Sequence, residues 1–141
     1  MKKYIRISVC ILIMICLGVS CKDVPTSVPI AKVNFTVSIY ANGLAHVGGH
    51  EYFTGAISGL VVYRVDMVNF QAYDRACPYD WKDGGYVRVD TSNSFHLICG
   101  SCQSTFNILD GFSLGQGKTN ATLRAYKAVL IDDINLRVSN Y

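Results

Sequence analysis

The chain has 141 residues and a formal net charge of +3, and its length favours a single domain. The excess positive charge lies in the first twenty residues, because residues 21–141 contain ten basic and ten acidic side chains. That balance argues against binding of nucleic acid through charge. Half of the residues are hydrophobic and 16% are charged, which argues against a disordered chain. Nine Tyr and six Phe residues favour a β-rich domain.

Residues 1–20 have the pattern of a secretion signal. A basic start that includes Lys2 and Arg6 precedes the apolar run Ile7–Leu17. This run is about as long as the core of a signal peptide and too short for a comfortable membrane span. Small residues then precede Cys21, an arrangement that resembles a bacterial lipobox. We therefore expect cleavage before Cys21 and acylation of its thiol; the alternative is an ordinary secretion signal followed by a chance cysteine.

Acylation at Cys21 would fix the protein to a membrane without a spanning segment. The protein would then work in a bacterial cell envelope outside the cytoplasm, with the outer membrane as the expected site, where disulfides are permitted. Residues 22–29 contain two prolines and little periodicity, which is typical of an extended spacer. The predicted organisation is a signal peptide at 1–20, a tether at 21–30 and a β domain at 31–141.

The domain body alternates in the manner of β-strands. From Val33 to Ile39 every second residue is apolar, which predicts a strand with one face on a core. Further short apolar runs predict strands at 60–65, 70–74, 86–90, 95–98, 125–131 and 134–138. After residue 21 the sequence has no convincing helical period. The pattern predicts an all-β domain, either a sandwich or a barrel.

Three cysteines lie in the predicted domain. Cys77 follows the strand expected at 70–74, and Cys99 and Cys102 follow the strand expected at 95–98. Two such loops can be presented at one end of a sandwich. The spacing of Cys99 and Cys102 is common in metal and redox sites, because two thiolates can converge across a tight turn. Three cysteines cannot all pair internally, which indicates a metal, a free thiol or an intermolecular disulfide.

The order of motifs around these cysteines carries a family resemblance. One predicted hairpin leads to Cys77-Pro78, and a second leads to Cys99-Gly100-Ser101-Cys102, followed by Phe106-Asn107 and Asp110-Gly111. In this order residues 60–138 resemble Rieske iron–sulfur domains, and in particular Rieske-like lipoproteins of Bacteroidetes-type bacteria. The resemblance implies an antiparallel β-sandwich with a small subdomain whose loops hold a cluster.

The resemblance also implies a [2Fe–2S] cluster with four protein ligands, used for one-electron transfer. Cys77 and Cys99 stand where the family has its two cysteine ligands. Tyr79 and Cys102 stand where it has two histidines. The predicted metal ligands are therefore Cys77, Tyr79, Cys99 and Cys102. Thiolates in place of imidazoles would lower the reduction potential.

Three residues are candidates for the fourth ligand. The Tyr79 phenol has a reference pKa of about 10, so it would need the charge of the metal to bind as phenolate. Asp80 lies in the same loop and could supply a carboxylate instead. His96 lies three residues before Cys99, on a strand from which its side chain would more readily point away.

Two functions fit these features. The first is a membrane-anchored electron-transfer or redox module with an altered [2Fe–2S] site, whose redox partner the sequence does not identify. The second is a cluster-free structural or interaction lipoprotein, in which Cys77 forms a disulfide with Cys99 or Cys102. A mononuclear zinc or iron site is a third state of the cysteines. The sequence carries no Ser-His-Asp or paired-carboxylate pattern, so the isolated chain is not expected to be an enzyme by itself.

Overall fold

The structure is a computed structural model that describes residues 26–40 and 42–140. The predicted signal peptide and the lipobox at Cys21 lie outside the described residues. Within those two ranges, no helix has the length and hydropathy needed to cross a membrane.

The described chain is all-β, as predicted, and its strands pair antiparallel. Two short 3₁₀ turns interrupt the strands, at Asn42–Leu44 (η1) and Trp81–Asp83 (η2). The strands are Asn34–Ser38 (β1), His50–Phe53 (β2), Leu60–Arg64 (β3), Phe70–Asp74 (β4), Val87–Val89 (β5), His96–Cys99 (β6), Thr105–Asn107 (β7), Ala125–Leu130 (β8) and Asn135–Ser139 (β9).

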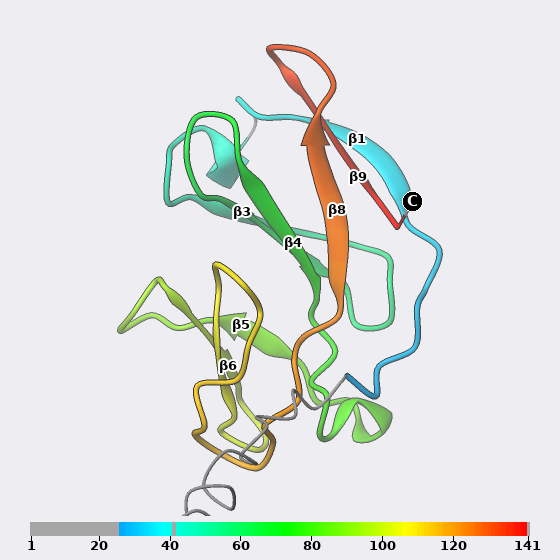
Figure 1. Ribbon diagram of the computed structural model, residues 1–141, viewed down its shortest axis with the longest axis vertical. Helices are drawn as coiled ribbons and strands as arrows, with labels where there is room; N and C mark the ends of the chain where they lie inside the picture. The colour runs from blue at the N-terminus through cyan, green and yellow to red at the C-terminus, as the bar shows by residue number, and fades with distance from the viewer. Residues whose placement is uncertain (1–25, 41, 141) are drawn as a thin grey trace, which may run out of the picture.

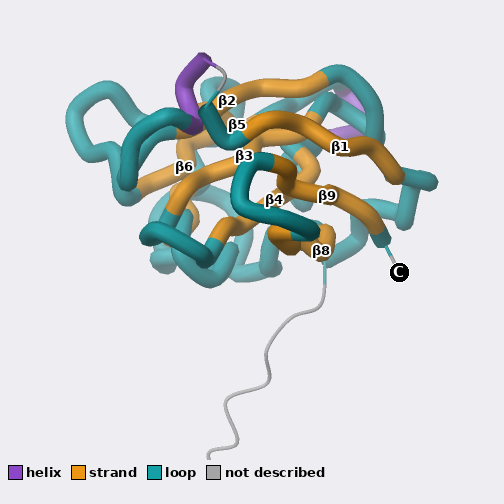
Figure 2. Tube along the Cα trace, turned by 90° about the horizontal axis from the view of Figure 1, so that it is seen from above, coloured by secondary structure: helices purple, strands orange, loops and turns teal. Residues whose placement is uncertain are grey.

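The larger sheet has six strands in the order β1-β9-β8-β4-β3-β2. The hairpins β3–β4 and β8–β9 follow from local turns, whereas β4 pairs with β8 and β1 with β9 across long stretches of sequence. Figure 2 shows the sheet curling so that its two edges, β1 and β2, lie on the same side. The rings of Phe35 on β1 and Phe53 on β2 close this gap, with their centroids 5.1 Å apart.

Side chains from the two faces of β3 pack into two different hydrophobic cores. Because successive side chains of a strand point to opposite faces, Leu60 and Val62 enter the core inside the curled sheet, while Val61 and Tyr63 enter the second core. We call the first the sheet core. It consists of Val33, Ile39, Leu44, Leu60, Val62, Phe70, Ala72, Tyr126, Leu136 and Val138.

The smaller sheet, β5-β6-β7, lies below the larger one in Figure 1 and forms the predicted small subdomain. Its three strands have only three or four residues each. We call the core beneath it the thiol core, because two of its members are Cys77 and Cys99. The others are Val61, Tyr63, Tyr73, Val87, Val89, Leu97, Phe106, Ile108 and Leu123.

Two strands and one anchoring contact differ from the sequence prediction. Strands β2 and β7 lie where no strand was expected. The segment predicted as a spacer packs against the domain at its end, because Val28 is fully buried and Ser27 Oγ donates a hydrogen bond to the Pro78 carbonyl at 2.7 Å. The last residues of the predicted tether are therefore held against the domain.

Candidate metal centre

The first ligand loop, residues 77–85, follows β4 and folds back on itself. Backbone hydrogen bonds run from Cys77 N to Gly85 O at 3.1 Å, from Trp81 N to Cys77 O at 2.9 Å, and from Gly85 N to Asp80 O at 2.9 Å. Gly84 has a φ of 82°, a left-handed conformation that costs glycine little. At Gly85 a Cβ atom would overlap the Asp80 carboxylate. The glycine pair thus lets the loop bring Asp80 inward.

The second ligand loop, residues 99–104, follows β6 as a tight turn. Gln103 N donates to Cys99 O at 3.0 Å, and Cys99 N donates to Ser104 O at 2.9 Å. Gln103 has a φ of 60°, and its side chain stabilises the turn by donating to Gly100 O at 2.8 Å. This turn carries Cys99 and Cys102 toward the first loop.

Three thiols and one carboxylate converge between these loops. Cys77 Sγ lies 3.5 Å from Cys102 Sγ, and Cys99 Sγ lies 3.4 Å from Asp80 Oδ1. One ligand atom from each of these four residues lies within 4.8 Å of the other three. The three cysteines are free, and the 3.5 Å separation is far longer than the 2.05 Å of a disulfide. The loop disulfide of the alternative hypothesis is therefore not formed in this structure.

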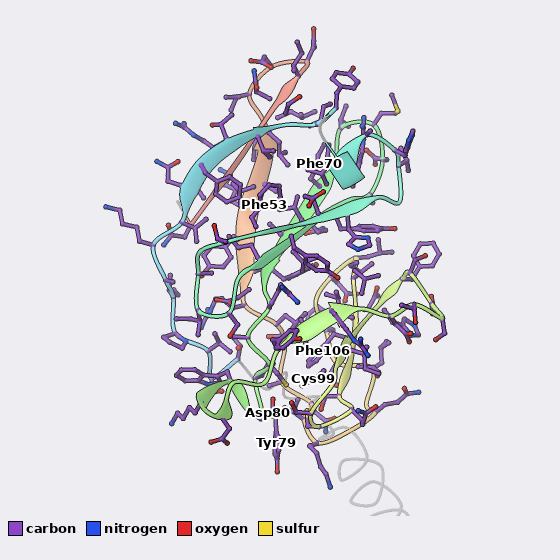
Figure 3. All side chains as sticks on the ribbon, turned by 180° about the vertical axis from the view of Figure 1, so that it is seen from behind. Phe53, Phe70, Tyr79, Asp80, Cys99 and Phe106 are labelled. Atoms are coloured by element: carbon purple, nitrogen blue, oxygen red, sulfur yellow. The ribbon has the colours of Figure 1, made fainter. Side chains whose placement is uncertain are left out.

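The three candidates for the fourth metal ligand lie in different positions relative to the cysteines. Asp80 is in the group, Tyr79 is 58% exposed, and Figure 3 shows the Tyr79 side chain extending beyond Asp80 to the end of the molecule. His96 lies on β6 with its Nε2 3.3 Å from the Asn93 amide nitrogen. Three of the four predicted ligands are thus brought together, and the carboxylate beside them comes from Asp80, which the sequence offered only as an alternative.

Burial favours the protonated form of two of the thiols, those of Cys77 and Cys99. It raises the pKa of the Cys77 thiol, and a hydrogen bond to Asp80 raises it further. Burial also raises the pKa of Cys99, which backbone hydrogen bonds from Cys102 and Ser101 partly offset. Since a metal binds the thiolate, a metal entering this group would release protons.

A third segment, residues 113–118, packs beside the second loop. The buried Ser104 hydroxyl accepts a hydrogen bond from Lys118 N at 2.9 Å and one from Cys102 Sγ at 3.2 Å. A Cβ atom at Gly117, whose φ is 86°, would overlap the Ser104 backbone. The small residues of this segment therefore allow it to approach the turn that presents Cys102.

The donor set fits a single tetrahedral ion. With metal–sulfur bonds of about 2.3 Å, the ligands of one tetrahedral ion lie about 3.8 Å apart. Two pairs of ligand atoms lie 3.4 and 3.5 Å apart here, and the other separations do not exceed 4.8 Å. Soft thiolates suit zinc, iron or copper(I). A two-iron cluster distributes its ligands over two metals, so ligands of different irons lie farther apart than those of one ion. The four groups would have to spread before they could hold such a cluster.

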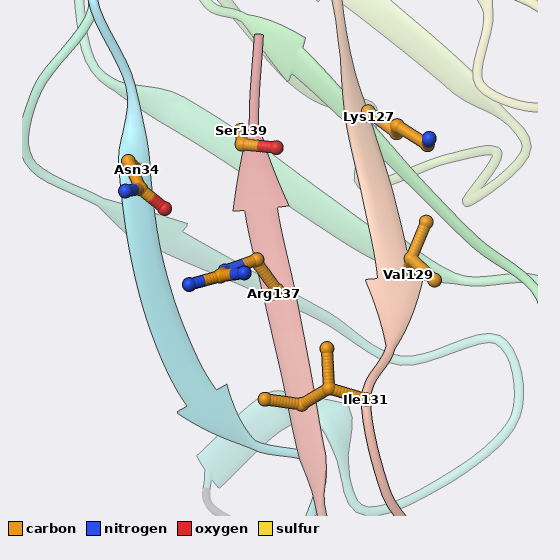
Figure 4. Close-up of a pocket in the computed structure, with 6 residues that line it drawn as sticks. All are labelled: Asn34, Lys127, Val129, Ile131, Arg137 and Ser139. Carbon is orange, nitrogen blue, oxygen red and sulfur yellow. The ribbon is translucent and has the colours of Figure 1, made fainter. Parts of the chain in front are cut away.

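One cavity, of about 340 Å³, borders the second ligand loop and is lined by Gly100 and Ser101 together with Tyr86 and Arg88. Two others lie away from the ligand loops. One of about 310 Å³ lies over β1, β8 and β9 and combines Lys127 and Arg137 with the apolar Val129 and Ile131 (Figure 4). Another of about 490 Å³ is lined partly by Arg75. The Arg75 guanidinium lies over the rings of Tyr52 and Tyr86, at 4.3 and 4.8 Å from their centroids. Neither cavity is lined by a cysteine.

Comparison with known proteins identifies no family. No protein-family model matches the sequence, and no curated protein matches it. Two solved structures align with a TM-score of 0.49. One, from Mycobacterium tuberculosis, is assigned as the small subunit of an NADH-dependent nitrite reductase; it is 17% identical, over 78% of this chain and 96% of that one. The other is the ferredoxin of carbazole 1,9a-dioxygenase from Nocardioides aromaticivorans IC177, 16% identical over 79% of this chain and 100% of that one.

Proposed function

We propose that the protein is an envelope-anchored metal–thiolate protein with a role in one-electron transfer, in which Cys77, Asp80, Cys99 and Cys102 hold iron. One observation carries the proposal: three thiols and a carboxylate from two loops lie within 4.8 Å of one another. Clusters of acidic groups often form on protein surfaces without binding a metal. The packing of a core, by contrast, does not require three thiols to point toward one another. Their convergence is the arrangement that a tetrahedral transition metal requires.

The residues around the group prepare it to hold a metal. Cys77 and Cys99 are fully buried within the thiol core, so apolar neighbours limit the access of water to their sulfurs. Asp80 would add a carboxylate oxygen to three thiolates. Ser104 lies where its hydroxyl can hydrogen-bond the Cys102 sulfur, and such bonds tune the potential of iron–thiolate sites. The bound iron would supply the change of oxidation state.

A [2Fe–2S] cluster is the second candidate, and the order of motifs favours it. Cys77 on one loop and Cys99 and Cys102 on the next follow the pattern that resembles Rieske domains. The close spacing of the four groups supports the single ion instead. The two candidates differ in iron content and in inorganic sulfide, so analysis of the purified protein separates them.

The lipobox-like sequence at Cys21 supports anchoring through acyl chains to a membrane of the bacterial envelope, with the outer membrane as the proposed site. An electron carrier in that position needs a redox partner but no substrate of its own. The balanced charge of residues 21–141 gives no support for a nucleic-acid partner.

The test is to purify the full acylated protein anaerobically and to measure iron, zinc and acid-labile sulfide. A single-ion site predicts one metal per chain without sulfide, and a cluster predicts two irons with two sulfides. C99S should remove the metal in either case. Y79F, which changes the neighbour of Asp80, is the matched control and should retain it. Zinc at full occupancy would overturn the redox role, and metal-free protein that C99S leaves unchanged would overturn the site.

A further inference from the structure

We infer that the tether holds the candidate metal centre beside the membrane surface, and that its redox partner is therefore a membrane-resident protein. The inference rests on the acylation of Cys21 that the proposed function includes. It does not follow from the metal ligands, because it depends on where the N-terminal segment meets the domain.

That segment meets the domain at the first ligand loop. Ser27 Oγ donates a hydrogen bond to the carbonyl of Pro78 at 2.7 Å, and the buried Pro78 lies next to Cys77 in the chain. Val28 is fully buried, and Arg124 fixes its carbonyl through hydrogen bonds of 3.0 and 2.6 Å. In Figure 1 the described chain begins beside this loop, at the end of the molecule that carries the small subdomain.

The chain between Cys21 and Ser27 is too short to carry this end far from the bilayer. Ser27 follows Cys21 by six residue steps, and a fully extended chain of six steps spans about 21 Å. A folded domain of 100 residues has a radius of gyration of about 13 Å, so its diameter exceeds that reach. The ligand loop thus stays within roughly one domain width of the acylated cysteine, whatever the tilt of the domain.

The position of the ligand loops near the bilayer favours a redox partner that lies in the same membrane. The space between the ligand loops and the bilayer is no wider than a small folded domain, which leaves little room for a separate soluble protein. Apolar side chains are exposed near the loops, including Tyr79 at 58% and Leu114 at 39%, and the Leu114 N–H donates to Thr105 O near the second loop. A protein embedded in the same membrane can present its own redox group to this end.

The single tryptophan of the chain reports the distance directly. Trp81 lies next to Asp80 in the first ligand loop. The full acylated protein is bound to phosphatidylcholine vesicles that contain a lipid with an energy-accepting dansyl headgroup. We expect about a twofold or greater loss of Trp81 emission, because the tether keeps this loop near the headgroups. The matched control carries about twenty Gly and Ser residues inserted after Lys22, which adds roughly 25 Å of reach and should restore most of the emission.

Equal emission from the acylated protein and the insertion variant would overturn the inference, as would a mass that shows no acyl chain on Cys21. The readout needs no metal, so quenched Trp81 in a metal-free protein would overturn the metal site of the proposed function and leave standing only the placement of this loop beside the membrane. The partner class is tested with reduced, metal-loaded protein on vesicles. Washed membranes that contain the partner should reoxidise it faster than a soluble extract, with the rate lowered in the insertion variant. Faster oxidation by the soluble extract would contradict a membrane-resident partner.

Discussion

The two cores on either side of β3 are built differently. The sheet core contains only apolar and aromatic side chains from the six-stranded sheet and its neighbouring loops. The thiol core includes two cysteines and lies beneath strands of three or four residues. A short three-stranded sheet has few ladder hydrogen bonds of its own, so links between its loops matter more to its stability. We therefore expect the larger sheet to need no ligand, whereas a bound metal would complete the small subdomain.

The buried polar groups of the two regions show the same difference. Asp74, at the end of β4, is fully buried and accepts hydrogen bonds from the backbone N–H groups of Ile57, Ser58 and Ala76 at 2.9 to 3.1 Å. Strong charge-assisted bonds therefore satisfy it. The thiols of the candidate metal centre contact one another and Asp80 only through weak S–H donors. A metal ion would replace these weak contacts with bonds.

Removal of the metal should have the largest effect, and it should be local. We expect chelation of the loaded protein to raise hydrogen exchange of the β5, β6 and β7 amides by about a hundredfold or more, because metal bonds that link loops contribute several kcal/mol. Exchange in β3 and β8 should change little. Equal effects on both sheets would break the comparison between the two cores.

Cavities created by substitution should also distinguish the thiol core from the sheet core. Leu97 in the thiol core and Leu136 in the sheet core are both fully buried. L97A and L136A should each lower the free energy of unfolding by about 3 kcal/mol, since both leave a cavity. Only L97A, next to the ligand loops, should also weaken metal binding, as measured by competition with a chelator. Equal metal affinities in the two variants would contradict a special role for the thiol core.

Asp74 tests how the larger sheet supports the first ligand loop. In D74N the amide would place N–H donors against some of the backbone donors that the carboxylate now accepts. We expect the free energy of unfolding to fall by about 2 to 3 kcal/mol, as measured by urea titration. The matched control is D132N, an exposed turn residue whose carboxylate also accepts backbone bonds, and it should cost much less. Similar losses of unfolding free energy in D74N and D132N would mean that burial does not strengthen the contribution of Asp74 to stability.

The smallest expected effect concerns pH and the edge strand β2. Burial lowers the pKa of His50 below 6.5, with Glu51 partly opposing it. The unfolded chain then binds the proton more tightly, so His50 contributes stability that is complete above about pH 6.5 and is lost as the pH falls through its lowered folded value. H50Q should flatten this slope in urea titrations between pH 7 and 5. H46Q, a change at an exposed loop histidine, serves as the control for the loss of a histidine.

The sequence predicts the strands that alternate strongly and form local hairpins. Residues 60–65 and 70–74 pair as β3 and β4 because an Asp66–Asn69 turn joins them. Strand β7 has only three residues, too few for a period to be recognised, and β2 follows directly on a glycine pair and alternates weakly. The pairings of β1 with β9 and of β4 with β8 join distant segments, and alternation carries no information about such partners.

The site was predicted in the same uneven way. The spacing of Cys99 and Cys102, with Cys77 on another loop, predicted the convergence of three sulfurs. The choice between Tyr79 and Asp80 depends on how the first loop turns, which periodicity does not report. A signal was present in Gly84 and Gly85, since the chain folds back at these glycines and the Asp80 carboxylate fills the space that a side chain at Gly85 would need.

The central claim is that Cys77, Asp80, Cys99 and Cys102 bind one metal ion together. X-ray absorption at the metal edge of the loaded, full-length protein tests it most directly. A single ion held by these four residues should show three sulfur neighbours at about 2.3 Å and one oxygen neighbour at about 2.0 to 2.2 Å, with the oxygen signal altered in D80N and kept in Y79F. A spectrum without a sulfur shell, or one that D80N leaves unchanged and Y79F alters, would contradict it.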